Sequence, residues 1–353
     1  MLTYILSLLL SILLSLGCIS FVRMVFPMFD IVDNPKKYGK KRKPIPYSVG
    51  IIFFVVFFLV SYIFIESNSK LLLIWFFGFF ITIVSFIDDI LNVSPKLRLI
   101  IQIIIGATIG ITSIKIGYVS NIFGGVLDLE TYFLTFFWFQ VYIIPLVFTV
   151  LWYVFVFNAL NWSDGIQGNT SGLSIISFLI IFFLWVKLYL SDDYEAGVKN
   201  AEFIMQMTII LVGVLIPFWY FDFKEKILMW DSGTMFLGFM LATMAIVSGG
   251  KIATVLVVFW IYSVDALYVV IRRIIKHKSP LKGDFTHLHH RLLDLGISKN
   301  QVLLLVYSLS FLFGLTALFL DRTGKIIVFG VIVVVVVFLN KILEKVKRIK
   351  YKK

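Results

Sequence analysis

The chain has 353 residues, and its 32 Lys and Arg outnumber its 20 Asp and Glu, which gives a net charge of +12. Hydrophobic residues make up 60% of it, against about 45–50% in soluble domains, and this excludes a soluble enzyme, a disordered chain and a nucleic-acid-binding module. The single cysteine, Cys18, excludes an intrachain disulfide framework and any multi-cysteine metal site.

Eleven apolar runs, bounded by charged residues, Gly or Pro, predict the membrane spans of an all-α polytopic protein. A span needs about 20 apolar residues, and helices are expected because an open strand cannot satisfy its backbone in hydrocarbon. We expect about 10–11 transmembrane helices in a single integral membrane domain, residues 1–353. In chain order the runs cover about 2–22, 49–65, 71–87, 97–117, 133–157, 171–190, 204–220, 235–248, 253–271, 302–320 and 326–340.

Two segments of the first half need separate treatment. The first run has no Lys or Arg before it and exceeds the apolar core of a signal peptide, which is about 7–15 residues long, so we expect a span there. At the end of the fourth run and after it, alternation around Ile114, Ile116, Gly124-Gly125, Leu127 and Leu129 predicts a small hairpin outside the bilayer.

The distribution of Lys and Arg predicts which side each loop faces. With the N-terminus outside, the cytoplasmic segments begin at residues 23, 88, 158, 221, 272 and 341 and carry 25 of the 32 basic residues. We therefore expect a multi-pass protein of the plasma or inner membrane with its C-terminus in the cytoplasm. The predicted cytoplasmic loops are about 23–48, 88–96, 158–170, 221–234 and 272–301, followed by a basic tail at 341–353.

Polar residues that could carry chemistry all fall on this predicted cytoplasmic side, as expected for functional groups near a membrane. Asp and Asn offer hard oxygen ligands without a cysteine cage, which favours Mg²⁺, or Mn²⁺ as a substitute, over zinc. In chain order the candidates are Asp88 and Asp89, then Asn158, Asn161 and Asp164, then Asp231, and finally the four histidines His277, His287, His289 and His290.

Two loops concentrate cationic and donor groups that suit phosphate. The stretch GDFTHLHHRLLDLG offers Thr286, three histidines and Arg291, and Arg grips phosphate with two parallel bonds. The early loop has six Lys and Arg between Lys36 and Lys43. Carboxylates, a divalent cation and phosphate-binding groups at one membrane face predict phosphoryl transfer to or from a lipid.

Each feature also has a structural interpretation. The paired aspartates could cap a helix, the two asparagines could be helix C-caps, and the histidine run could be a simple turn or part of a zinc site. The basic loop could only anchor the chain on anionic lipid. For Asp265, inside the ninth run, we expect pairing with Arg272 or Arg273 along the helix.

Taken together, the motifs resemble the polyprenyl-phosphate N-acetylhexosamine-1-phosphate transferases of glycosyltransferase family 4, especially the bacterial undecaprenyl-phosphate GlcNAc-1-phosphate transferase branch. The resemblance covers roughly residues 30 to 300 and implies a ten- or eleven-helix fold with a cytoplasmic site. The matching stretches are DNPKKYGKKRKPIPYSVG, FIDDILNVSPKLRLIIQ, NALNWSDGIQG, DSGTMFLGF and SPLKGDFTHLHHRLLDLG.

The resemblance also implies residue roles in the transfer of a HexNAc-1-phosphate, with GlcNAc as the expected sugar, from a UDP-sugar to a polyprenyl phosphate with release of UMP. Asp88, Asp89 and Asp164 are the candidate catalytic residues, and the paired aspartates lie near the lipid phosphate. Asp231, Asn161 and Asp164 are the candidate Mg²⁺ ligands. The candidate substrate-binding residues are Asn158, Asn161, Gln167, Lys96, Lys43, His287, His289, His290 and Arg291.

Two positions depart from the family pattern. Gln167 stands where a second aspartate is common, and Val49-Gly50 replaces a glycine pair. For the mechanism we favour direct attack by the lipid phosphate, which is mostly a dianion at pH 7; displacement in two steps through Asp88 or Asp89 is the alternative.

The expected partners are polyprenyl phosphate, a UDP-sugar and membrane lipids, without nucleic acid, and a homodimer is left open. The alternative donors are UDP-MurNAc-pentapeptide and UDP-sugars with a modified HexNAc. A transporter of an anionic solute is the rival from another class, although such proteins place their sites at the midplane and show inverted repeats, which this sequence lacks. A structural scaffold would leave the one-sided polar clusters unexplained.

Overall fold

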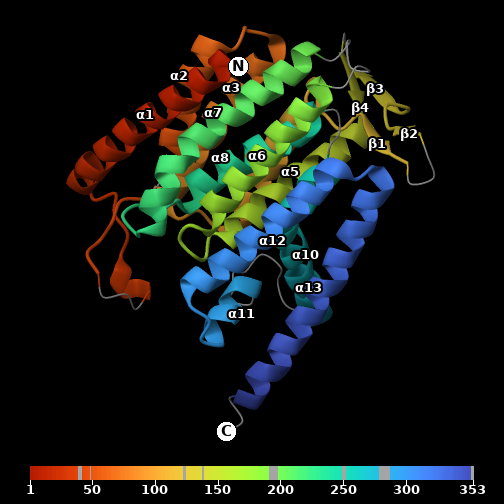
Figure 1. Cartoon of the computed structure of the whole chain (residues 1–353). Helices are drawn as coiled ribbons and strands as arrows, with labels where there is room; N and C mark the ends of the chain where they lie inside the picture. The colour runs from red at the N-terminus through yellow and green to blue at the C-terminus, as the bar shows by residue number, and fades with distance from the viewer. Residues whose placement is uncertain are drawn as a thin grey trace.

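The computed structural model describes residues 1–38, 42–47, 49–121, 125–136, 139–190, 198–248, 252–277 and 287–350. Helices form nearly all of it, and two small β-hairpins lie at one end (Figure 1). In the first half the elements are α1 (Leu2–Val25), the short 3-10 turns η1 (Phe26–Phe29) and η2 (Pro35–Tyr38), α2 (Gly50–Phe64), α3 (Ser69–Leu91), α4 (Pro95–Gly110), β1 (Tyr118–Ser120), β2 (Val126–Asp128), β3 (Phe133–Phe136), β4 (Phe139–Tyr142) and α5 (Ile143–Ser163).

Over its described residues, the second half contains helices and connecting loops but no strand. Its elements are α6 (Asn169–Tyr189), α7 (Val198–Phe223), α8 (Trp230–Val247), α9 (Ile252–Val258), α10 (Trp260–Ile275), α11 (Leu288–Asp294), α12 (Lys299–Phe319) and α13 (Arg322–Lys350).

All eleven predicted apolar runs contain helix, which confirms an all-α membrane fold. Within the described part of the chain, eight helices are long and apolar enough to cross a membrane: α1, α3, α5, α6, α7, α8, α12 and α13. The other three runs form the shorter α2 and α4 and the pair α9–α10, which is interrupted at Phe259. The eighth run forms a helix that begins at Trp230, and it therefore includes Asp231 in its first turn.

The β-structure confirms one prediction and corrects another. β1 and β2 pair as an antiparallel hairpin, with Tyr118 opposite Asp128, where the alternating pattern predicted one. The predicted span at 133–157, however, begins with strands, because β3 and β4 form a second hairpin with Phe133 opposite Tyr142. Aromatic and β-branched residues in this segment favour strands, and α5 begins only at Ile143.

The core of the bundle lies around α7 and α8. These two helices are the most completely buried of the candidate spans, and α7 packs on α1 and α6 while α8 packs on α3 and α5. Small residues allow close approach, as is usual for membrane helices: a Cβ at Gly213 of α7 would lie 2.6 Å from Cβ of Ser11 in α1. Ser15 Oγ also donates to the carbonyl of Val214, at 2.8 Å.

Both ends of the bundle are defined by how the helices start and stop. α3 begins with Asn68, whose side chain accepts from the amide of Leu71, and ends at Asn92 in a left-handed conformation. α4 starts anew at Pro95, and this turn brings the end of α3 beside the start of α4. Figure 1 places the hairpins at the end of the bundle opposite to α11. The polar motifs gather at the α11 end.

Candidate active site

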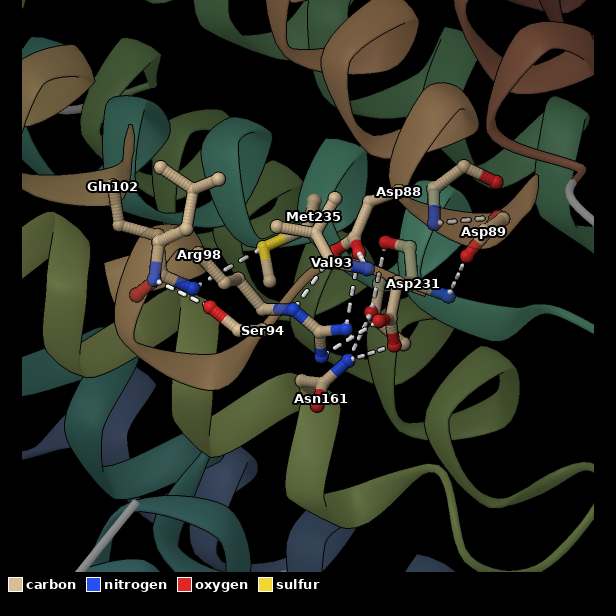
Figure 2. Close-up of polar contacts among 12 residues, drawn as sticks. Asp88, Asp89, Val93, Ser94, Arg98, Gln102, Asn161, Asp231 and Met235 are labelled. Atoms are coloured by element: carbon tan, nitrogen blue, oxygen red, sulfur yellow. Dashed lines mark hydrogen bonds and ion pairs between the residues drawn. The ribbon is translucent and has the colours of Figure 1, made fainter. Parts of the chain in front are cut away.

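An arginine near the start of α4 joins two aspartates that are far apart in the chain (Figure 2). Arg98 Nε lies 2.8 Å from Oδ2 of Asp88, and its Nη1 lies 2.7 Å from Oδ2 of Asp231. Asp88, at the end of α3, is 7% exposed and also accepts from the amide of Val93 at 2.9 Å. Buried carboxylates are stable only when paired in this way, so Arg98 holds the ends of α3 and α8 together.

Asp89 has a different role from its neighbour. Its two carboxylate oxygens accept the backbone amides of Asp231 and Ser232, at 3.0 and 3.1 Å. These amides open α8, where the free N–H groups and the helix dipole attract a negative charge. The helix-capping interpretation is thus confirmed for Asp89, although the helix that it caps is α8 and not its own. Asp89 fixes the position of Asp231.

The two asparagines of α5 have different partners. Asn161 Nδ2 donates to Oδ1 of Asp231 at 2.5 Å and to the hydroxyl of Thr234 at 3.2 Å. Asn158 Nδ2 donates to Oε1 of Gln102 in α4, at 2.6 Å. Both lie inside α5, so the C-cap interpretation was wrong; the C-cap residue is Asp164. Asn161 reaches the acid cluster, whereas Asn158 joins α5 to α4.

The loop from Asp164 to Gly168 is held from two sides. Asp222 of α7 accepts from the amide of Gly168 and from the hydroxyl of Ser171, both at 2.8 Å. Tyr307 of α12 donates to the carbonyl of the same Gly168, and Gly168 has a φ of +91°, which favours glycine. The two peptide units that flank Gly168 are therefore both fixed.

Asp164 sits at the end of α5, close to the other acids. Burial raises the pKa of Asp164 well above its usual value, and the nearby charges of Asp222 and Asp231 raise it further, although Thr170 and the backbone of Trp230 hydrogen-bond to its carboxylate. Trp230 has an unusual positive φ of 54°, and its ring stacks on Tyr47 at 4.0 Å. A bulky residue held in this conformation is typical of a functional site.

The histidine run packs directly on the loop that contains Asp164. A Cβ at Gly165 would lie 2.5 Å from Nε2 of both His289 and His290, so only glycine fits beneath the two rings. His289 Nε2 is buried and has no hydrogen-bond partner among the described residues. Burial lowers the pKa of His289 well below its usual value, with a further contribution from the neighbouring His290 and His287. His289 is therefore neutral at pH 7.

We expected Asp265 to pair with Arg272 or Arg273 of its own helix, but its partners in the structure lie at the start of α11. Its Oδ2 lies 2.8 Å from Nδ1 of His287, and both of its oxygens accept from the amide of Leu288. Arg291 is buried on the other side of this run, where it donates to the carbonyl of Asn340 and lies over the ring of Tyr268. The structure thus joins His287, His289 and His290 to the site but directs Arg291 toward α10 and α13.

The remaining predicted residues are less tightly connected to the centre. Arg42, one of the six basic residues of the early loop, pairs with Asp33 at 2.6 Å and supports the fold of that loop. Lys43 and Lys96 are exposed, and Gln167 is half-buried beside Gly168. Thr286 falls outside the described residues, so its predicted role stays a prediction.

Sequence analysis missed three residues that the structure brings into the site. Arg98 lies within the stretch FIDDILNVSPKLRLIIQ. A cation ten positions after Asp88, at the start of the next helix, could have indicated that the two side chains meet. Asp222 is an acid at the end of an apolar run, which marks a functional candidate in a membrane protein. The contact of Asp265 with His287 had no signal in the sequence, because it depends on how α10 meets α11.

The donor set suits a hard divalent cation. Over the described residues no group of three His, Cys, Asp or Glu side chains is close enough to enclose a metal ion by itself. Mg²⁺ usually takes only one or two carboxylates and completes its shell with water and phosphate oxygens. Asp231 beside Asn161 meets that requirement, and Arg98 occupies a cation position between Asp231 and Asp88. The residues therefore fit Mg²⁺ bound together with a phosphate-containing substrate.

Comparisons with known proteins identify the family. The chain is 25% identical over 334 residues to a probable undecaprenyl-phosphate N-acetylglucosaminyl 1-phosphate transferase of Bacillus subtilis. The aligned region covers 92% of this chain and 86% of that relative. A decaprenyl-phosphate N-acetylglucosaminephosphotransferase of Mycobacterium leprae is 31% identical over 44% of this chain and 42% of its own length. A phospho-N-acetylmuramoyl-pentapeptide-transferase of Staphylococcus epidermidis is 25% identical over 84% of this chain and 91% of its own.

A family model supports the same assignment. Residues 71–249 match the model described as glycosyl transferase family 4, and this half of the chain contains the paired aspartates, Asn161, Asp164 and Asp231. The chain therefore belongs to glycosyl transferase family 4.

Proposed function

We propose that the protein transfers GlcNAc-1-phosphate from UDP-GlcNAc to a polyprenyl phosphate, as the first step of a lipid-linked cell-envelope glycan. An oxygen of the lipid phosphate attacks the β-phosphorus of the UDP-sugar, the bond to the bridging oxygen breaks, and UMP leaves. One observation carries the proposal: the acids and the asparagine of the matched segment meet at one end of the bundle, around Asp88, Asn161 and Asp231. The names of the relatives support this substrate class.

An apolar cavity beside the acid cluster supports a lipid acceptor. It has a volume of about 120 Å³ and runs between α3 and α4, from Asp88 and Arg98 toward Ile105 and Phe157. A polyprenyl phosphate has an apolar chain and an anionic head, and this cavity offers an apolar wall that ends at a guanidinium. We infer that Nη2 of Arg98, which makes only a long contact of 3.3 Å with Asp88, turns to the lipid phosphate when the acceptor binds, while Nε keeps its contact with Asp88.

The contacts of the paired aspartates favour direct attack over a covalent enzyme intermediate. A nucleophilic carboxylate needs an oxygen free to reach phosphorus, yet both oxygens of Asp89 accept amides of α8. Asp88 is held by Arg98 and by the amide of Val93. The lipid phosphate is itself a competent nucleophile at pH 7. Asp88 and Asp89 therefore act as positioning groups for the acceptor and for Asp231.

Mg²⁺ is the expected cofactor, with Mn²⁺ as a substitute. Asp231 would hold it, together with the side-chain oxygen of Asn161 or with Asp164. Bound there, the ion would offset the negative charge of the donor diphosphate and of the departing UMP. Activity is expected to disappear in excess EDTA and to return with Mg²⁺ or Mn²⁺, and full activity in EDTA would contradict the assignment.

The site is expected to face the cytoplasm, where UDP-sugars are available. The charge distribution supports this orientation. In a Cys18→Ser background, a cysteine at Lys43 should react with an impermeant reagent only after the membrane is opened. A cysteine at Asp128, on the exposed β2, should react in intact cells. The reverse pattern would overturn the orientation.

A turnover assay with purified protein tests the function as a whole. Undecaprenyl phosphate is supplied with UDP-GlcNAc, UDP-GalNAc, UDP-glucose or UDP-MurNAc-pentapeptide, and UMP and the lipid product are measured. We expect the highest kcat/KM with UDP-GlcNAc and no UMP without lipid phosphate. Preference for UDP-MurNAc-pentapeptide would keep the reaction class and change the substrate. Solute flux into proteoliposomes without UMP release would support a transporter instead.

A further inference from the structure

Asp265 has no part in the transfer reaction described above, yet it is one of the most enclosed carboxylates of the site. It lies on α10 and is 4% exposed, and His287, its partner, is 5% exposed. The two come from different segments, because His287 is the residue just before α11. A buried carboxylate is costly unless it is paired and hydrogen-bonded, so this contact is a specific feature of the site.

Two donors converge on the carboxylate of Asp265. The amide of Leu288 lies 3.1 Å from Oδ1 and 3.2 Å from Oδ2, and Nδ1 of His287 lies 2.8 Å from Oδ2. The backbone amide can only donate, and an ionised carboxylate can only accept. Nδ1 of His287 must therefore carry a hydrogen.

The position of that hydrogen decides what the other side of the ring offers. With Nδ1–H directed at Asp265, Nε2 is the nitrogen left for a ligand. The His287 ring lies parallel to that of His289, with centroids 5.9 Å apart, and 6.0 Å from the ring of Trp162, which follows Asn161. His287 is therefore stacked beside His289, which packs on Gly165 in the loop that follows Asp164.

We propose that Asp265 is a positioning residue that fixes His287 with its hydrogen on Nδ1 and presents Nε2 to the UDP-sugar. The second half of this statement rests on the proposed function, whereas the first half does not. In the same way, a metal-bound or catalytic histidine has its free nitrogen defined by the hydrogen bond at the other one.

The variant Asp265→Asn tests this directly, because an amide has only one acceptor oxygen. The amide of Leu288 must keep that oxygen, so the NH₂ group of the asparagine faces Nδ1 of His287. Nδ1 then has to accept, and the hydrogen moves to Nε2. Asp265→Glu retains two acceptor oxygens and should restore the Nδ1–H form. Asp294→Asn, an exposed change on α11, is the matched control.

The first measurement is made without substrate. The chain has four histidines, so ¹⁵N spectra of histidine-labelled protein in detergent, with His287→Gln for assignment, report which nitrogen of His287 carries the hydrogen. We expect Nδ1–H in the wild type, in Asp265→Glu and in Asp294→Asn, and Nε2–H in Asp265→Asn. Nε2–H in the wild type would overturn the proposal even if the asparagine variant fails to fold.

The second measurement separates positioning from mere folding. In the turnover assay we expect Asp265→Asn to raise KM for UDP-GlcNAc about tenfold or more, as for a reversed hydrogen bond to a bound group, with a smaller change in KM for the lipid. An equal rise in KM for UDP-GlcNAc and for the lipid would overturn the ligand role of Nε2. If the wild type shows the Nδ1–H form but no turnover of any UDP-sugar, the proposed function fails and the assignment of Asp265 and His287 stands.

Discussion

The two ends of the bundle are stabilised in different ways. At the α11 end, contacts join segments that are far apart in the chain, as when Arg98 pairs with Asp231 or when Asp89 accepts the first amides of α8. At the opposite end, the hairpins are closed by local contacts: Lys115 pairs with Glu130 at 3.2 Å and lies 3.7 Å from the ring of Tyr142.

These two kinds of contact distinguish the end of the bundle that carries chemistry from the end that does not. Local ion pairs at an exposed surface contribute little to stability and tolerate change. Burying a charge between helices costs roughly several kcal/mol of hydration free energy, and only an ion pair with well-fixed geometry offsets this cost. The α11 end therefore retains charges that a purely structural end would not need, and substitutions should be severe there and mild at the hairpins.

The largest expected effect comes from Asp231→Asn. The variant keeps size and hydrogen bonding but removes the charge that pairs with Arg98 and that would hold Mg²⁺. We expect UMP release to fall by at least about a thousandfold. Glu130→Gln at the hairpin end is the control and should retain wild-type turnover. Comparable losses in both variants would remove the distinction between the two ends.

The paired aspartates should both be sensitive, with Asp89 no less so than Asp88. In Asp89→Asn a single oxygen must serve two amides of α8, so Asp231 shifts; in Asp88→Asn the ion pair with Arg98 is lost. We expect each to reduce kcat by about a hundredfold or more. The check is the initial rate at saturating substrates. If Asp89→Asn has a kcat close to that of the wild type, the cap on α8 is dispensable for turnover.

Arg98 should be needed for its shape as well as for its charge. Arg98→Lys keeps the charge but cannot contact Asp88 and Asp231 through separate nitrogens of one planar group. We expect KM for the lipid phosphate to rise about tenfold or more, and Lys115→Ala at the other end to leave it unchanged. An Arg98→Lys enzyme with a normal KM for the lipid would place the acceptor phosphate elsewhere.

Asp222→Asn should have the smallest of these effects. Both contacts are accepted by the same oxygen, Oδ2, so an amide oxygen in that place keeps them both and the loop loses only the negative charge beside it. We expect a rise of about three- to tenfold in KM for UDP-GlcNAc, with less change for the lipid. Thermal unfolding in detergent should show whether the loop or the whole bundle is affected; a large drop in Tm with normal kinetics would make Asp222 purely structural.

Much of this organisation could be predicted from the sequence, because charged residues stand out in an apolar chain. The helices and the gathering of Asp88, Asn161 and Asp231 on one side of the bundle followed from that contrast, whereas the first hairpin followed from an alternating pattern. The second hairpin was missed since the segment FLTFFWFQVY is as apolar as a span, and periodicity does not separate the two over so short a length.

Contacts that depend on how helices pack could not be predicted. Arg98 is one of several cations near the loops, and only the turn between α3 and α4 directs it at both aspartates. For Asp265 the sequence offers only the arginines of its own helix as partners, because nothing in it places α11 against α10. Arg291 was assigned to the substrate by the family motif, yet its side chain is buried toward Asn340.

The most direct test of the central claim is the metal preference of Asp231→Cys in a Cys18→Ser background. A thiolate is a poor ligand for Mg²⁺ and a good one for softer ions such as Cd²⁺. If Asp231 binds the catalytic cation, UMP release should be lost with Mg²⁺ and partly restored with Cd²⁺, while Asp88→Cys stays inactive with both. If Asp231→Cys instead follows the wild type in its metal preference, Asp231 is not a metal ligand and the account of this end of the bundle is contradicted.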